Sequence, residues 1–207
     1  MNRVILSAST DETILAVTRQ HKLVDLEIEQ QINTEIVGCI YKGVVKNIVP
    51  AVDGIFVDIG IGKNAFLRRK DLLNEKRFPT EGSPILAQVI KSDTDMKGAL
   101  ITEKISMFGK YAVTLSGTGY IGVSKKIRQE SVRKRLKEIG KEICAEHMGL
   151  IIRTAAENAD MDEFRKDITR LKENWDIIQK RFRMEKSPTL LYRESDIIVK
   201  ALRDYVN

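Results

Sequence analysis

Apolar and polar side chains alternate in three short runs near the start of the chain, and turn-forming residues separate the runs. The runs are Arg3–Ser7, Glu12–Thr18 and Lys22–Ile28. Successive side chains of a strand point to opposite faces, so this alternation is typical of strands that bury one face. The pattern predicts a β-meander.

A second group of predicted strands follows, separated by glycine, proline and aspartate turns. Its clearest members are Ile36–Val49, Ile55–Ile59, Ile85–Lys91 and Ala99–Ile105. A short helix or coil is expected at Arg68–Arg77. The spacing predicts five short strands in about seventy residues, which is the size of an OB-type β-barrel.

Helical spacing appears only after the barrel segment. Two weak strands are expected at Tyr111–Leu115 and Tyr120–Val123, a helix at Ser131–Glu146, a strand at Gly149–Thr154, a long helix after Asp160, a strand at Thr189–Arg193 and a last helix at Ile197–Tyr205. Apolar residues of the long helix recur three and four positions apart, which indicates a core-facing stripe. The fold class is therefore α+β. Because the chain ends inside a predicted helix, we expect it to be part of a longer protein.

The distribution of charge along the chain also predicts a class of binding partner. The chain of 207 residues has a formal net charge of +6, and Lys104–Glu146 holds ten basic against four acidic residues. A local positive field attracts polyanions, so nucleic acid is the expected partner; a solvated helix face is the alternative. No segment is apolar enough to predict a membrane span, and the amino terminus does not resemble a signal peptide. Cys39 and Cys144 fit no metal spacing, so we expect free thiols, no zinc and a cytoplasmic location.

The stretch GIFVDIGIGKNAFL, Gly54–Leu67, has two interpretations. Gly60, Gly62 and Ala65 fit a loose nucleotide-binding pattern, but the strand before them carries Asp58 and too few residues follow for a crossover helix. The second interpretation is a barrel whose aromatic rings stack on unpaired bases. Phe56 and Phe66 are expected on adjacent strands, or on a strand and its exit loop, close enough to stack on one base; core packing is the alternative. The lysines expected to contact phosphates are Lys42, Lys46, Lys63 and Lys97.

Several motifs resemble known RNA-processing proteins. Tyr41-Lys-Gly43, Gly54-Ile-Phe-Val-Asp58, Ala65-Phe-Leu67 and Lys97-Gly-Ala99 resemble the RNA-binding barrel first named for the largest small-subunit ribosomal protein. The order of MNRVILSAS, IYKGVVKNIVP, FVDIG, KGALIT, MGLIIRTAA and RESDIIVKALRDY resembles the ribonuclease E/G endoribonucleases over the whole chain. The resemblance implies an RNase H-like start at residues 1–35, an inserted OB barrel at 36–103, a 5′-sensor domain at 104–198 and a truncated return to the RNase H-like part at 199–207.

The resemblance also implies roles for individual residues. Phe56, Phe66 and Lys97 match the barrel's RNA-contacting residues. The expected 5′-phosphate sensor comprises Gly109, Val113, Lys125, Arg153 and Thr154, of which Arg153 and Thr154 match the pair that grips a 5′-monophosphate. An arginine beside a hydroxyl suits a phosphate on its own chemistry as well, although a buried structural arginine is the alternative. Lys125 stands where the family often has arginine, and Ile59 where some members have an aromatic residue.

The family's hydrolytic chemistry is not expected within this chain. The resemblance implies Mg²⁺-dependent phosphodiester cleavage by aspartates of a later nuclease domain. Asp93 with Asp95, and Asp160 with Asp162, are not expected to converge on a metal. We therefore expect no catalytic residue, metal or cofactor here, and an inactive, monomeric fragment of a bacterial, homo-oligomeric endoribonuclease of rRNA processing and mRNA decay. Its partner would be single-stranded RNA, preferably with a 5′-monophosphate. The alternatives are a stand-alone RNA-binding module and a nucleotide-dependent enzyme.

Overall fold

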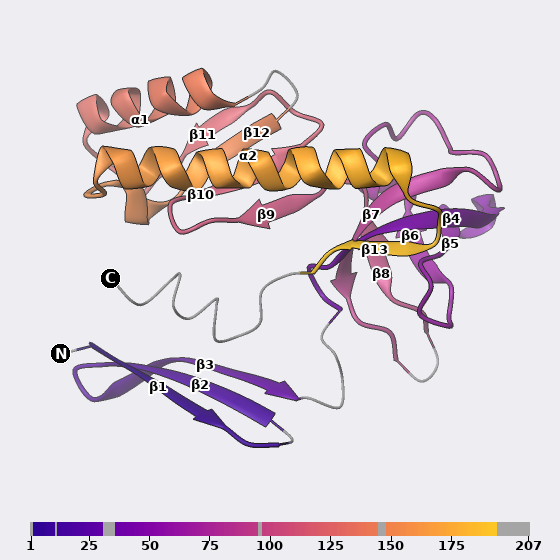
Figure 1. Ribbon diagram of the computed structural model, residues 1–207, viewed down its shortest axis with the longest axis horizontal. Coiled ribbons are helices and arrows are strands. Elements are labelled where there is room, and N and C mark those ends of the chain that lie inside the picture. Colours follow the sequence, from indigo (N-terminus) through magenta and orange to yellow (C-terminus); the bar gives the residue numbers. More distant parts are fainter. Residues whose placement is uncertain (1, 11, 31–35, 95–96, 145–147, 194–207) are drawn as a thin grey trace. The chain divides into compact units, whose positions relative to one another are not determined.

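The computed structural model describes residues 2–10, 12–30, 36–94, 97–144 and 148–193, which form two compact units (Figure 1). One unit contains the amino-terminal strands, and the other is Val37–Arg193. The predicted helix Ile197–Tyr205 lies outside the described residues.

The amino-terminal strands form the predicted meander. β1 (Asn2–Ala8), β2 (Glu12–Arg19) and β3 (Lys22–Gln30) pair antiparallel in the order β1-β2-β3. Leu15 and Val17, two residues apart, are buried on one face of this sheet, with Val4 packed against them. Alternate residues of these strands thus lie on opposite faces of the sheet, as the sequence pattern predicts.

A five-stranded barrel forms the first part of the larger unit. Its strands are β4 (Ile40–Val49), β5 (Gly54–Asp58), β6 (Ala65–Arg68), β7 (Pro84–Lys91) and β8 (Leu100–Thr102). They pair in the order β4-β5-β6-β8-β7, and β7 pairs back onto β4, which closes the barrel. Alternate side chains such as Ile55, Val57 and Leu67 fill its interior. The predicted barrel is confirmed, although β6 is a separate strand that the pattern did not resolve.

Short 3-10 helices occupy the connections of the larger unit. They are Pro50–Val52, Arg69–Asp71 and, after the strand Met148–Ile152, Thr154–Ala156. The connection from β5 to β6 is the glycine-rich turn with Gly60 and Gly62, and β6 runs antiparallel to β5. A crossover helix is absent between these two strands, so the nucleotide-binding interpretation is wrong.

A second sheet carries both long helices. β9 (Ser106–Phe108), β10 (Ala112–Ser116), β11 (Ile121–Val123) and β12 (Met148–Ile152) lie in the order β11-β12-β10-β9. α1 (Glu130–Ile143) and α2 (Met161–Met184) join one core with this sheet, and α2 continues toward the barrel (Figure 1). Phe164, Ile168 and Leu171 of the predicted stripe are buried, and Asp160 caps α2 with its side chain.

Within the larger unit, the last described strand connects α2 back to the barrel. β13 (Thr189–Tyr192) pairs antiparallel with the first residues of β4, so a segment about 150 residues away in sequence extends the barrel sheet. The strand was predicted, but its partner was not.

Candidate nucleic-acid interface

Phe56 and Phe66 form an aromatic pair on neighbouring strands of the barrel. The two residues are direct cross-strand partners, and their ring centroids lie 5.4 Å apart at an interplanar angle of 51°. Both side chains are half-buried. A Cβ on Gly54 would lie 2.3 Å from two ring carbons of Phe66, so the ring lies directly against the glycine backbone. Aromatic pairs at this separation are favourable, and the position of the rings is therefore well defined.

The lysines expected near this pair come from two loops that touch each other. Gly98 packs so closely on the loop before β6 that a Cβ would lie 1.9 Å from the main-chain oxygen of Asn64. The Phe66 N–H donates to Ala99 O at 2.7 Å, and Lys63 Nζ donates to Thr94 O at 2.9 Å. Lys63 and the neighbouring Lys97 are exposed. The two lysines thus lie on touching loops at the start of β6, the strand that carries Phe66.

Lys42 does not join these residues. Its ammonium donates to Phe182 O at 2.7 Å and to Glu185 O at 2.6 Å, and its side chain is 9% exposed. A cation at the C-terminus of α2 satisfies main-chain carbonyls that lack helical partners. Lys42 is therefore a structural contact between the barrel and α2, and the expectation that it contacts RNA is corrected.

Lys46 and Ile59 are two further barrel positions, and only Lys46 is exposed. Lys46 forms an ion pair with Asp58 at 3.4 Å, and an Asp58 oxygen accepts the Gly60 N–H at 2.9 Å, which holds the glycine turn. Ile59 is 1% exposed and belongs to the core. The side chain at position 59 is thus not accessible to a base.

Four of the five predicted sensor residues lie at the ends of strands on one side of the second sheet: Gly109, Lys125, Arg153 and Thr154. Arg153 follows β12, and its Nη1 donates to Gly109 O at 2.8 Å and to Lys110 O at 3.3 Å. The Arg153 N–H also donates to Tyr111 O at 2.8 Å. Two carbonyl contacts orient a guanidinium that carries five N–H donors in a fixed plane. The geometry is compatible with both a phosphate-binding role and a structural one.

The turn that Arg153 contacts is also held from the side of α2. Asp167, 6% exposed, accepts the Lys110 N–H at 3.2 Å and the Tyr111 N–H at 2.8 Å. A Cβ on Gly109 would lie 2.4 Å from an Asp167 carboxylate oxygen, so glycine is required for this close approach. Tyr111 donates its phenol proton to Glu163 at 2.6 Å, which raises the pKa of Tyr111 to about 12. The Gly109–Tyr111 turn is therefore fixed by hydrogen bonds from two directions.

Thr154 and Lys125 lie on the other side of Arg153. The hydroxyl of Thr154 is 3.0 Å from the hydroxyl of Ser124, and the Ser124 N–H donates to Ile152 O at 2.8 Å. Lys125 follows Ser124 and is exposed, as is Thr154. We call the group Gly109, Lys110, Ser124, Lys125, Arg153 and Thr154 the sensor corner.

Val113 belongs to the same sheet but to its open face. It pairs with Phe108 of β9 and with Ile151 of β12, which are 46% and 39% exposed. The alternate residues Ala112 and Ile152 are fully buried in the core shared with the helices. Val113 therefore lies in a row of partly exposed apolar side chains, on the face of the sheet that the helices do not cover.

Four residues of this region were missed by the sequence reasoning. They are Phe108, Lys110, Ser124 and Asp167. Only Asp167 had a recognisable signal, because a carboxylate beside Ile168 and three residues after Phe164 lies on the buried side of α2 and needs hydrogen-bond donors. The contribution of Ser124 depends on the turn after β11 reaching the end of β12, which local sequence does not reveal.

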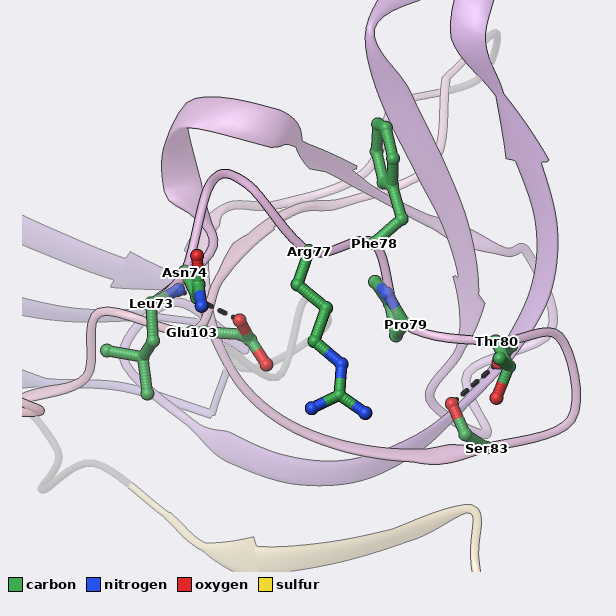
Figure 2. Close-up of a pocket in the computed structure, with 8 residues that line it drawn as sticks. All are labelled: Leu73, Asn74, Arg77, Phe78, Pro79, Thr80, Ser83 and Glu103. Atoms are coloured by element: carbon green, nitrogen blue, oxygen red, sulfur yellow. Dashed lines mark hydrogen bonds between the residues drawn. The ribbon is translucent and has the colours of Figure 1, made fainter.

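A cavity of about 370 Å³ lies outside both groups of residues. Figure 2 shows the Arg77 guanidinium extending into the space between Glu103 and Ser83, while the Phe78 ring points away. Phe78 instead lies under Arg69, whose guanidinium carbon is 3.8 Å from the ring centroid. Burial raises the pKa of Glu103, and its Oε2 accepts the Leu73 N–H at 2.9 Å. None of the predicted site residues lines this cavity.

The described residues show no group of three or more histidine, cysteine, aspartate or glutamate side chains that could hold a metal ion. In the same part of the chain, no helix is both long and apolar enough to cross a lipid bilayer.

The closed five-stranded barrel has the architecture of the OB class, a fold that often binds oligonucleotides. Residues 34–102 match the S1 RNA binding domain, and residues 106–207 match the ribonuclease E/G family. The chain is 33% identical to Ribonuclease G of Escherichia coli (strain K12), over 99% of this chain and 45% of that relative. It is 31% identical to Ribonuclease E of Buchnera aphidicola subsp. Schizaphis graminum, over 100% of this chain and 23% of the relative.

A third relative, Ribonuclease E of Synechocystis sp., is 34% identical over 86% of this chain and 28% of its own length. The chain belongs to the ribonuclease E/G family and carries an RNA-binding barrel. It spans less than half the length of these relatives.

Proposed function

We propose that this chain is the RNA-binding and 5′-monophosphate-sensing portion of a single-strand-specific endoribonuclease. The observation that carries the proposal is the sensor corner, where Arg153 is oriented by two carbonyls beside the Ser124–Thr154 hydroxyl pair. A guanidinium and a hydroxyl provide charge-assisted donors for a terminal phosphate, and Lys125 adds charge without a planar fork.

The barrel provides a second, independent contact in this proposal. The rings of Phe56 and Phe66 stack on bases, and Lys63 and Lys97 contact phosphates on the loops beside them. A ring face carries no information about the chemistry of the 5′ end, so the barrel binds RNA with either end group. Arg153 and Thr154, in contrast, increase the affinity for RNA that carries a terminal monophosphate. A bulkier triphosphate enters the corner poorly.

The remainder of the activity belongs, in this proposal, to the longer parent protein. The parent is a bacterial, cytoplasmic, Mg²⁺-dependent endoribonuclease that acts in rRNA processing and mRNA decay. It is a homo-oligomer. The Mg²⁺ ligands lie outside the described residues, and this part of the protein needs no cofactor of its own. The 207-residue chain by itself is monomeric and does not cleave RNA.

The test compares the affinities of the wild type and its variants for two RNAs that differ only in carrying a 5′-monophosphate or a 5′-hydroxyl. Phe66→Ala weakens both RNAs equally, by about 1–3 kcal/mol for one lost base stack. Arg153→Ala weakens only the monophosphorylated RNA, by about 1.5–3 kcal/mol, the range for hydrogen bonds to a charged group. Fluorescence anisotropy at fixed salt measures all the affinities.

Arg153→Lys is the matched control, because it keeps the positive charge and removes the planar fork. It is expected to retain part of the preference for the monophosphate. Equal losses on both RNAs for Arg153→Ala, in a variant that remains folded, would show that Arg153 is structural. Metal-dependent cleavage that survives repurification would overturn the inactivity of this chain. A full-length reading frame without a nuclease domain would favour the stand-alone RNA-binding module.

A further inference from the structure

The net positive charge of the chain is concentrated in one surface segment. Lys125–Lys141 contains eight basic and two acidic residues, an excess equal to the +6 of all 207 residues. All of these residues lie in the described part of the chain, in the turn after β11 and along α1. The segment begins beside Ser124, whose hydroxyl contacts Thr154 of the sensor corner.

The segment is joined to the sensor corner by hydrogen bonds. Arg133, in the first turns of α1, donates from Nη1 to Ser124 O at 2.7 Å and to Ile127 O at 2.9 Å. It also lies 3.8 Å from Glu130. Arg133 is therefore occupied in holding the turn against α1, and it fixes the start of the helix relative to the corner.

Three lysines of α1 share one exposed face. Lys134, Lys137 and Lys141 are spaced three and four residues apart, which places them on one side of a helix over about 10 Å of its length. We call these residues the α1 lysine row. No described residue forms an ion pair or hydrogen bond with their ammonium groups, whereas Glu142 of the same helix pairs with Arg165 of α2.

The chemistry around the row favours phosphates over a protein or lipid surface. None of the exposed large apolar side chains in the described residues lies on α1, although the centre of a protein interface is normally apolar or aromatic. The apolar side of α1 is buried, with Leu136 and Ile139 in the core, so the helix has no apolar face to insert into a membrane. Nucleic-acid interfaces, in contrast, are strongly positive and polar.

We propose that the α1 lysine row binds the phosphate backbone of RNA next to the 5′ end held at the sensor corner. This inference rests on the proposed function and extends it, because it adds a sequence-independent contact outside the terminal nucleotide. The row supplies electrostatic affinity, and the sensor corner supplies the preference for the end group. Neither contact reads a base.

The experiment measures the salt dependence of RNA binding for two triple variants of the 207-residue chain. Replacing Lys134, Lys137 and Lys141 by alanine reduces the slope of log K against log salt by about 2, since each single-strand phosphate contact contributes about 0.7. Between 50 and 200 mM salt, the wild-type affinity then falls about 15-fold more than that of the variant. The control replaces Lys166, Lys180 and Arg183, exposed cations of α2, and makes the same change in net charge.

The control variant is expected to keep the wild-type slope, and arginine at the three row positions is expected to restore it. Equal slopes for the two alanine variants would overturn the proposal and leave the row a solvated helix face. An unchanged RNA slope together with lost binding of an acidic protein would equally overturn it in favour of a protein partner. The proposed function fails separately if the RNA affinity of the wild type does not depend on the 5′-monophosphate while the salt slope still depends on the α1 lysine row.

Discussion

Replacing Lys42 by methionine tests whether the barrel and α2 form one stable unit. Methionine keeps the length and apolar stem of lysine but removes the ammonium that bonds Phe182 O and Glu185 O. It also removes the cation that lies 5.1 Å from the centroid of the Phe182 ring. The carbonyls at the C-terminus of α2 then lose a buried donor.

The structure gives the size of the expected effect. A hydrogen bond to a charged group is worth about 1.5–3 kcal/mol, and a cation at a helix C-terminus adds about 0.3–1 kcal/mol. The buried ammonium also costs free energy that methionine avoids, so the contributions do not add in full. We expect Lys42→Met to lower the free energy of unfolding by about 2–4 kcal/mol, which corresponds to about 5–15 °C in Tm for a chain of this size.

Urea and thermal unfolding can be followed through Trp175, the single tryptophan of the chain, which is half-buried on α2. Lys46→Met on the same strand is the matched control. Its ion pair with Asp58 is solvent-exposed, and such a pair is worth only about 0.2–1 kcal/mol. RNA affinity of Lys42→Met, measured where the variant is folded, should equal that of the wild type. Equal stabilities for the two variants, or a specific loss of RNA affinity in Lys42→Met, would refute the structural role of Lys42.

Two further predictions concern the loops and the buried phenol. Gly98→Ala separates the loops that meet at Asn64 O, so RNA affinity falls while the preference for a 5′-monophosphate remains; unchanged affinity by anisotropy would contradict this. The pKa of Tyr111 rises from 10.0 to about 12 mainly because its phenol donates to Glu163, so this bond stabilises the fold fully below pH 10 and less as the pH approaches 12. The stability difference between wild type and Tyr111→Phe in urea should therefore shrink across that interval, and a constant difference would disprove the assignment.

Local pattern was sufficient for the elements with strong periodicity. The alternation of the first strands and the stripe of α2 each record a single buried face, so the sequence alone predicts them. The barrel was predicted from the spacing of strands and turns. The aromatic pair was predicted as well, because Phe56 and Phe66 flank a turn that brings their strands together.

Features that depend on distant contacts could not be predicted in this way. β6 and β9 have four and three residues, too few to show a period. The partner of β13 lies about 150 residues earlier, and the role of Lys42 follows from that pairing and from the end of α2. Lys42 sits among apolar strand residues, so its sequence context resembles that of a surface lysine on the barrel. The sensor corner likewise combines a β9–β10 turn, the end of β12 and one carboxylate of α2.

The pairing of β13 with β4 has a consequence for how this barrel can be exchanged or isolated. Excision after Thr102 would leave the main-chain groups of β4 that β13 satisfies without partners, and would create an open strand edge prone to self-association. The same cut would remove both acceptors of the Lys42 ammonium. Recombination between relatives would therefore preserve these contacts only if the barrel were transferred together with α2 and β13. We expect this region to be inherited as one block.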